Sequence, residues 1–177
     1  MSIVSNRRRP VGVAAIGLLG RVALQNGVEP LQDVDNRKVA VESYNRCWDL
    51  LDRDDRSQDE DFDLLTSAFV SRYHRSLAGG PEQWTVSNWM VSRAAADIGE
   101  GSLSLAFARR ANDAVREFDA PDWLVASAAE GMARAYAALG SEQDRDEWFN
   151  KAEGLVAALA DEEDRELIAS QLASVPH

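Results

Sequence analysis

Residues 88–115 read NWMVSRAAADIGEGSLSLAFARRANDAV, and residues 129–156 read AEGMARAYAALGSEQDRDEWFNKAEGLV. At this offset of 41 residues, small, apolar and glycine positions coincide in the pairs Ser92 and Ala133, Ile98 and Leu139, Gly99 and Gly140, Phe107 and Trp148, and Ala111 and Ala152. The small pair lets two helices approach closely, and the glycine pair makes the turn between them. Because a single helical hairpin cannot bury its own apolar face, we expect the two hairpins to stack side by side.

Helical periodicity continues through almost the whole chain after residue 35, and no run of β-branched and aromatic residues marks a strand. The pattern predicts an all-α fold of six or seven helices, antiparallel because the loops between them are short. The expected helices are Asn36–Leu51, Asp61–Leu77, Pro81–Ile98, Ser102–Phe118, Pro121–Leu139, Ser141–Ala160 and Glu162–Leu172.

The second expected helix has one apolar stripe that we predict to be buried, made of Phe62, Leu65, Phe69 and Tyr73 or Leu77. Gly79 and Gly80 follow this helix, and they accept the left-handed backbone geometry of a helix end without steric cost. Pro81 suits the first position of the next helix, where its missing N–H is not needed.

The second copy of the repeat resembles a tetratricopeptide hairpin, with that family's small, aromatic and glycine positions at Ala133, Tyr136, Gly140, Phe149 and Ala152. The first copy departs from the pattern, because Ala95 and Ala108 replace its two aromatic residues. More broadly, residues 60–174 resemble small bacterial tetratricopeptide-like proteins of uncharacterised function, through SRYH (71–74), Trp89, AFARR (106–110), MARAYAALG (132–140) and DEEDREL (161–167). The resemblance implies a right-handed superhelix of stacked hairpins.

The chain carries a formal net charge of −11, concentrated in the acidic stretches at 49–63 and 141–166. The region between them is nearly balanced, and no basic stripe offsets the two acidic flanks. A polyanion would be repelled by these flanks, so we expect no nucleic-acid partner.

Residues 1–35 are expected to form a tail, flexible or as a short helix, ahead of a single helical domain at 36–177. Arg7, Arg8 and Arg9 precede an apolar run at 11–19, as in an export signal, but Arg21 interrupts the run. The run is too short to span a bilayer, so we expect no membrane partner, with export as the alternative. The single Cys47 cannot form an internal disulfide, which fits a cytoplasmic protein.

His74 is the first candidate for a catalytic residue, and Arg72 and Arg75 lie close to it in the sequence. A general base needs a carboxylate to orient it, and none is adjacent in the sequence. The alternative is a structural histidine near the end of a helix, and the absence of an adjacent carboxylate favours it.

No metal, cofactor or catalytic constellation is predicted. His74, His177 and Cys47 are too few for a zinc site, and no glycine-rich phosphate loop is present. The acidic loop at 52–63 resembles a calcium loop in its carboxylate spacing, but Arg56 and Ser57 occupy positions that need a ligand and a glycine. We expect a solvated acidic loop.

Tryptophans and arginines gather in the repeated half, at Trp84, Trp89, Trp123, Trp148, Arg93, Arg109 and Arg134. Both residue types are enriched where proteins bind partners. Trp89, Arg93 and Asp97 are four residues apart and share one helix face, which predicts a groove with arginines on an aromatic floor. The alternative is that the tryptophans fill the core and the arginines pair with Asp97 and Glu130.

We therefore expect a non-enzymatic module that binds a protein or peptide, and that forms a homodimer to cover its ends. The candidate binding residues are Arg72, His74, Trp89, Arg93, Arg109 and Arg134. The rival interpretation is a sensor for a small molecule or anion, or an enzyme, with one pocket around His74, Arg72, Arg93 and Trp89.

Overall fold

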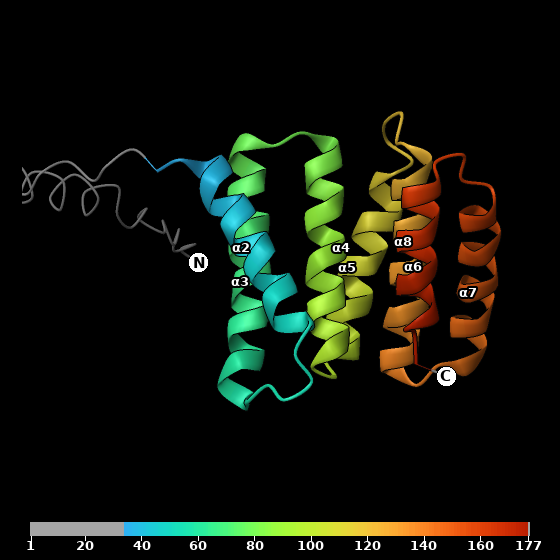
Figure 1. The fold of residues 1–177 in the computed structure, drawn as a ribbon, viewed down its shortest axis with the longest axis horizontal. Coiled ribbons are helices and arrows are strands. Elements are labelled where there is room, and N and C mark those ends of the chain that lie inside the picture. Colours follow the sequence, from blue (N-terminus) through green and yellow to red (C-terminus); the bar gives the residue numbers. More distant parts are fainter. Residues whose placement is uncertain (1–33, 177) are drawn as a thin grey trace, which may run out of the picture. The chain divides into compact units, whose positions relative to one another are not determined.

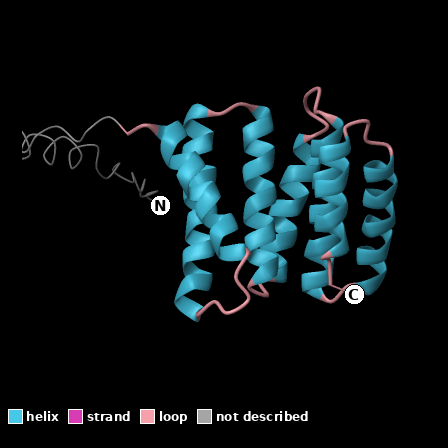
Figure 2. Ribbon diagram, in the orientation of Figure 1, coloured by secondary structure: helices cyan, strands magenta, loops and turns pink. Residues whose placement is uncertain are grey.

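The computed structural model describes residues 34–176, and all regular structure in this part of the chain is helical (Figures 1 and 2). Its seven helices are α2 (Asn36–Leu51), α3 (Gln58–Ala78), α4 (Pro81–Asp97), α5 (Gly101–Ala114), α6 (Asp122–Leu139), α7 (Glu142–Ala157) and α8 (Glu162–Ala173). The predicted all-α class is confirmed. The tail expected at 1–35 lies, except for its last two residues, outside the described part of the chain.

The helices pack as sequential hairpins, α2 with α3, α4 with α5 and α6 with α7, and α8 packs on α6 and α7. The even-numbered helices α2, α4, α6 and α8 also contact one another in that order. Pro81 begins α4 and Asp122 begins α6, and the helices that follow them begin at Gly101 and Glu142. Both pairs of starts are 41 residues apart, so the predicted equivalence of the two hairpins is confirmed.

Gly99 and Gly140 make the equivalent turns after α4 and α6, with φ angles of 81° and 73°. These are left-handed conformations, which cost a residue with a side chain about 1 kcal/mol or more. In both turns the next N–H returns to a carbonyl of the helix, from Glu100 to Ala95 at 2.8 Å and from Ser141 to Tyr136 at 3.0 Å. The prediction of a glycine turn is correct at both positions.

The expected left-handed geometry at Gly79 is wrong, because its φ is −111° and its ψ is 173°. Space, rather than backbone conformation, requires glycine there. A Cβ on Gly79 would lie 2.7 Å from the carbonyl oxygen of Arg75 and 3.0 Å from Cβ of Gln83. The glycine thus allows α4 to begin directly beside the end of α3, with Pro81 at its first turn as predicted.

The start of α3 was expected at Asp61, but the helix begins at Gln58. Ser57 and Glu60 form a capping box there. The Ser57 side chain accepts a hydrogen bond from the Glu60 N–H, and the Glu60 carboxylate accepts one from the Ser57 N–H at 2.8 Å. These two bonds satisfy backbone donors that would otherwise remain free, which extends the helix toward the loop.

Of the stripe expected to be buried on α3, Leu65 is partly buried and packs against the core, but the other members are exposed, with Phe62 61 %, Phe69 37 %, Tyr73 59 % and Leu77 55 % accessible. The buried residues of this helix are Leu64, Ala68 and Ser71. Helix α3 packs against both α2 and α4. The small side chains of Ala68 and Ser71 allow this close approach, whereas a phenylalanine or tyrosine at those positions would hold the helices apart.

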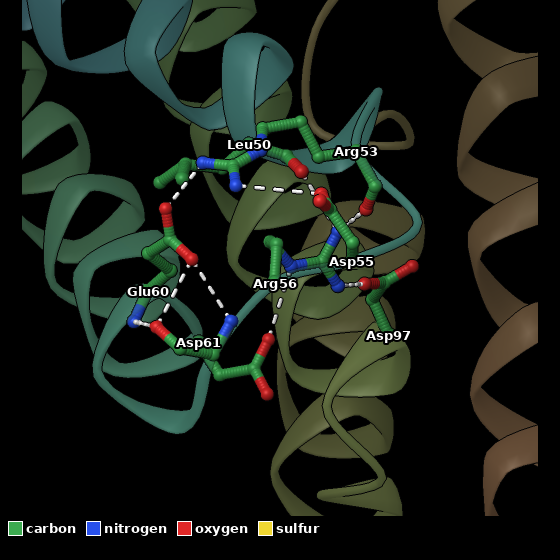
Figure 3. A network of polar contacts seen from close by, with 8 residues as sticks. Leu50, Arg53, Asp55, Arg56, Glu60, Asp61 and Asp97 are labelled. Atoms are coloured by element: carbon green, nitrogen blue, oxygen red, sulfur yellow. Dashed lines mark hydrogen bonds and ion pairs between the residues drawn. The ribbon is translucent and has the colours of Figure 1, made fainter.

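Two arginines organise the acidic loop between α2 and α3 (Figure 3). Arg53 pairs with Glu60, and Arg56 pairs with Asp61 at 3.0 Å and with Asp97 at the end of α4. Arg56 also donates to the carbonyl of Leu50 at 2.7 Å. The loop is therefore held by ion pairs that connect it to the first turn of α3 and the last turn of α4.

Candidate functional site

The residues at 48, 89, 130 and 171 form a line across the even-numbered helices α2, α4, α6 and α8. They are spaced by the same 41 residues as the repeat. The ring centroids of Trp48 and Trp89 are 6.0 Å apart. The indole N–H of Trp89 donates to Oε2 of Glu130 at 2.9 Å, and Arg134 donates to the carbonyl of Gln171 at 2.7 Å. Trp48, Trp89 and Glu130 are thus joined by direct contacts, and Arg134 connects Glu130 to Gln171.

A cavity of about 550 Å³ lies beside this line. We call it the inner groove. Its walls come from all four even-numbered helices and include Tyr44, Trp48, Val86, Trp89, Arg93, Trp123, Leu124, Ser127, Leu167, Ile168 and Gln171. Aromatic rings from three helices converge here, and the 41-residue spacing accounts for two of them, since Trp48 and Trp89 occupy corresponding positions. The volume lies in the range of small-ligand and peptide side-chain pockets.

Glu130 is fully buried behind the groove, where three side chains contact its carboxylate. Trp89 donates to Oε2, and Nε of Arg134 donates to Oε1 at 2.7 Å. Nη1 of Arg93 lies 3.7 Å from the same Oε1. A buried carboxylate is costly unless it is paired and hydrogen-bonded, and Glu130 meets both conditions. The expected alternative had the arginines pair with Asp97 and Glu130. It is correct for Glu130, which pairs with Arg93 and Arg134, but Asp97 pairs with Arg56 instead.

Arg93 differs from Arg134, because its guanidinium is only partly satisfied. It lies over Trp48 and Trp89, 5.2 and 5.7 Å from the ring centroids. Its Nε and Nη1 are buried and have no hydrogen-bond partner in the described part of the chain. Burial lowers the pKa of Arg93, and the charge of Arg134 adds to this effect while Glu130 opposes it. Unpaired buried donors are unfavourable, so this guanidinium is a site for an acceptor.

The Arg56 ion pair explains why Arg93 lacks a close partner on its own helix. Asp97, one turn further along α4, pairs with Arg56 from the loop. The cluster of Arg93, Glu130 and Arg134 therefore carries one more positive than negative charge. Two carboxylates, Asp52 and Asp164, line the groove as well. The groove thus combines a buried cation on aromatic rings with acidic residues in its walls.

The six candidate residues predicted from the sequence do not form one site. Trp89 and Arg93 line the inner groove, and Arg134 lies behind it, with Ser174 and Gln171 as partners. Arg109 is exposed on α5 and lies 3.5 Å from the hydroxyl of Tyr136.

Arg72 and His74 line two other cavities. Arg72 donates to Asn88 at 2.8 Å, and Nδ1 of His74 lies 2.7 Å from Oδ1 of Asn36. The four residues of the rival interpretation, His74, Arg72, Arg93 and Trp89, are therefore divided among three cavities.

The sequence analysis missed Tyr44 and Trp48 as groove residues. Trp48 could have been found by extending the 41-residue offset backward from Trp89, since the same offset leads forward to Glu130. The extension is hidden in the sequence, because the residues around position 48 share few identities with the later copies. The contact between the Trp48 and Trp89 rings makes the relation visible.

Among residues 34–176, no group of three or more histidine, cysteine or acidic side chains is placed to hold a metal ion. No helix in the same range is long and apolar enough to span a membrane. Comparison with known proteins returns no similarity: no family model, curated protein or solved structure matches the chain.

Proposed function

We propose that the protein is a non-enzymatic module that binds a peptide segment of a partner protein in the inner groove. The observation that carries this proposal is the guanidinium of Arg93, which is buried on two tryptophan rings. Its Nε and Nη1 have no hydrogen-bond partner among the described residues, and Glu130 is 3.7 Å from Nη1. Backbone carbonyls and carboxylates of a peptide are the acceptors that such a group needs.

The composition of the groove supports a peptide over a small polar molecule. Tyrosine, tryptophan and arginine carry much of the binding energy in protein interfaces, and Tyr44, Trp48, Trp89 and Arg93 converge here from two helices. The carboxylates of Asp52 and Asp164 favour a basic residue in the same segment. The expected partner is therefore a segment with an acceptor for Arg93 and a lysine or arginine nearby.

The resemblance to tetratricopeptide hairpins adds support, because the even-numbered helices contact one another in order and line the groove. We place the module in the cytoplasm, where a buried, unpaired Cys47 remains reduced. We also propose a homodimer, since exposed apolar side chains gather on the first hairpin at Val41, Phe62, Phe69, Tyr73 and Leu77. Light scattering tests the dimer, and a monomer at micromolar concentration removes it.

Selection from a random peptide library tests the proposed binding. We expect the wild-type protein to enrich peptides with a shared motif that contains an acidic residue or a free carboxylate. Arg93→Met keeps the length and packing of the side chain but removes the donors, and we expect it to lose this enrichment.

Arg109→Met is the matched control, because Arg109 is exposed on α5 and does not line the groove. It should retain the motif, and circular dichroism should show that both variants are folded. Enrichment of the same peptides by Arg93→Met and the wild type would contradict the proposal. The variant Asp52→Lys should reduce the preference for a basic residue in the motif while leaving the preference for an acceptor.

A further inference from the structure

A second cavity, of about 600 Å³, lies between the first half of α2, the end of α3 and the first turn of α4. We call it the α2–α3–α4 cavity. Its charged and titratable lining residues are Arg37, His74 and Arg75, and no acidic residue lines it. The whole chain has 30 Asp and Glu against 19 Lys and Arg. The local charge is therefore opposite in sign to that of the protein.

Arg75 is the central residue of this cavity. Its guanidinium lies over the ring of Tyr44, 4.8 Å from the centroid, and its Nε is buried without a hydrogen-bond partner. Burial lowers the pKa of Arg75. Two other arginines with low exposure have carboxylate partners, Arg56 with Asp61 and Arg134 with Glu130.

The guanidinium of Arg75 has no such partner within residues 34–176, although it has lost part of its hydration. Desolvation of an unpaired cation is unfavourable, and an anion in the cavity would offset this cost.

Arg37 extends the positive wall, and His74 lies beside it. Arg37 is exposed on α2 and forms no ion pair with the described residues. His74 is oriented by the 2.7 Å contact between its Nδ1 and Oδ1 of Asn36. Because Oδ1 is an acceptor, Nδ1 is the donor, and Nε2 is left without a partner in this part of the chain.

The backbone at the start of α4 adds to the same potential. Gly79 and Gly80 line the cavity, and Gly80 is the N-cap of the 17-residue α4. Because Gly80 has no side chain, it cannot accept hydrogen bonds from the first-turn N–H groups as a serine or aspartate would. The positive end of the helix dipole thus lies at the cavity beside the arginines. The remaining wall is apolar, formed by Ala40, Val41 and Ala78.

We propose that the α2–α3–α4 cavity binds a small organic anion, with its phosphate or carboxylate group at Arg37 and Arg75 and next to His74. Its apolar part then covers Ala40, Val41 and Ala78. This site is separate from the inner groove, with which it shares no lining residue. The proposed anion site therefore includes His74 but, unlike the pocket of the rival interpretation, does not include Trp89 or Arg93.

Calorimetric titration with phenyl phosphate, benzoate and benzyl alcohol tests the proposal. We expect one saturable site per chain for at least one of the two anions and none for the neutral alcohol, and the stronger anion identifies the preferred acidic group. Arg75→Met should weaken binding at least about tenfold, since a charge-assisted hydrogen-bond pair is lost. Arg37→Gln should weaken it several-fold without affecting the fold, because Arg37 is exposed and unpaired among the described residues.

Arg72→Met is the matched control for Arg75→Met. Both arginines are on α3 and both lie over an aromatic ring, Arg72 over Phe107 at 5.4 Å, but Arg72 lines a different cavity. It should bind the anion within about twofold of the wild type, and so should Arg93→Met.

No saturable binding of either anion, or equal binding of the neutral alcohol, overturns the proposal. The same holds if Arg75→Met and Arg37→Gln bind as the controls do, or if Arg93→Met alone loses binding. Should Arg75→Met fail to fold, the result for Arg37→Gln decides.

Discussion

The indole N–H of Trp89 on α4 donates a 2.9 Å hydrogen bond to the buried carboxylate of Glu130 on α6, and these two residues occupy equivalent positions of successive hairpins. The repeat thus places a donor and an acceptor at the same position of neighbouring units. Position 48 before them and position 171 after them continue the line. A contact between equivalent residues fixes the register of one hairpin on the next, because a slip of one helical turn would separate the pair.

Glu130→Ala should lower the free energy of unfolding by about 3–5 kcal/mol, because it leaves Arg134 buried without its carboxylate. Urea denaturation measures the change. Glu153→Ala is the control, since Glu153 is exposed on α7, and it should change stability by less than about 0.5 kcal/mol. Equal losses of stability in the two variants would show that the buried pairing of Glu130 does not stabilise the fold.

Two glycine-to-alanine substitutions should change the stability of the protein in opposite directions. Gly140 has a φ of 73°, so Gly140→Ala should destabilise the protein by about 1 kcal/mol or more. Gly154 lies within α7, and a Cβ there meets nothing within 4 Å, so Gly154→Ala should stabilise the protein by about 0.5–1 kcal/mol. Thermal unfolding of both variants checks the pair, and destabilisation by Gly154→Ala would contradict the open surroundings of that residue.

Arg56 connects the end of α2, the first turn of α3 and the end of α4, and we infer that it determines the conformation of the loop in Figure 3. Arg56→Met should cost about 2–3 kcal/mol, because it removes bonds from a charged donor to two carboxylates and to the carbonyl of Leu50. Arg46→Met, which removes an exposed arginine 3.8 Å from Asp63, should cost at most about 1 kcal/mol. Chemical denaturation of the two variants at the same ionic strength makes the comparison. A cost for Arg56→Met as small as that for Arg46→Met would mean that the loop is held by other contacts.

Glu60 should make the stability of the first hairpin depend on pH. The hydrogen bond from the Ser57 N–H, followed by the contact with Arg53, lowers the pKa of Glu60 from 4.5 to about 2. Because the pKa is lower in the folded state, the contribution is present above pH 4.5 and is lost as the pH falls toward 2.

Glu60→Gln should therefore unfold at a lower temperature than the wild type near pH 6, with a difference that shrinks toward pH 2. Asp59→Asn serves as the control for a neighbouring carboxylate. A difference that stays constant with pH, or a pKa near 4.5 in a carbon-13 titration, would refute this assignment.

Cys47 should be protected from thiol reagents in the native protein. It is fully buried, and burial raises the pKa of its thiol from 9.0 to about 12, so little thiolate forms at pH 8. Since the folded pKa is the higher one, this site favours the folded state below pH 9 and loses that contribution as the pH rises toward 12. Alkylation with iodoacetamide should follow unfolding, and rapid modification under native conditions would be inconsistent with this burial.

Features that depend on local backbone chemistry were predictable. The glycine turns at Gly99 and Gly140 and the start of α4 at Pro81 each follow from the conformation that one residue type allows. The capping box of Ser57 and Glu60 was also readable from its spacing, although it was overlooked within an acidic run.

The buried side of α3 was not predictable in the same way. This helix has large apolar residues such as Phe62 and Tyr73 on one side and Leu64, Ala68 and Ser71 on another. Sequence periodicity shows that a helix has an apolar and a polar face. The packing of α2 and α4 decides which face of α3 is buried. The smaller side is buried because two neighbouring helices must approach it closely.

By itself the sequence determined the helical class, the two glycine turns and the 41-residue equivalence of the hairpins. All of these depend on residues close in the chain or on a regular spacing. Only the tertiary structure decided that Arg134 is hydrogen-bonded to Glu130, whereas Arg93 and Arg75 keep buried donors without a hydrogen-bond partner among the described residues. It also decided that His74 lies in a different cavity from Trp89. The pairing of a charged side chain depends on how several helices are rotated relative to one another. A rotation that moves a helix face by one residue position would bring a different partner to the charge.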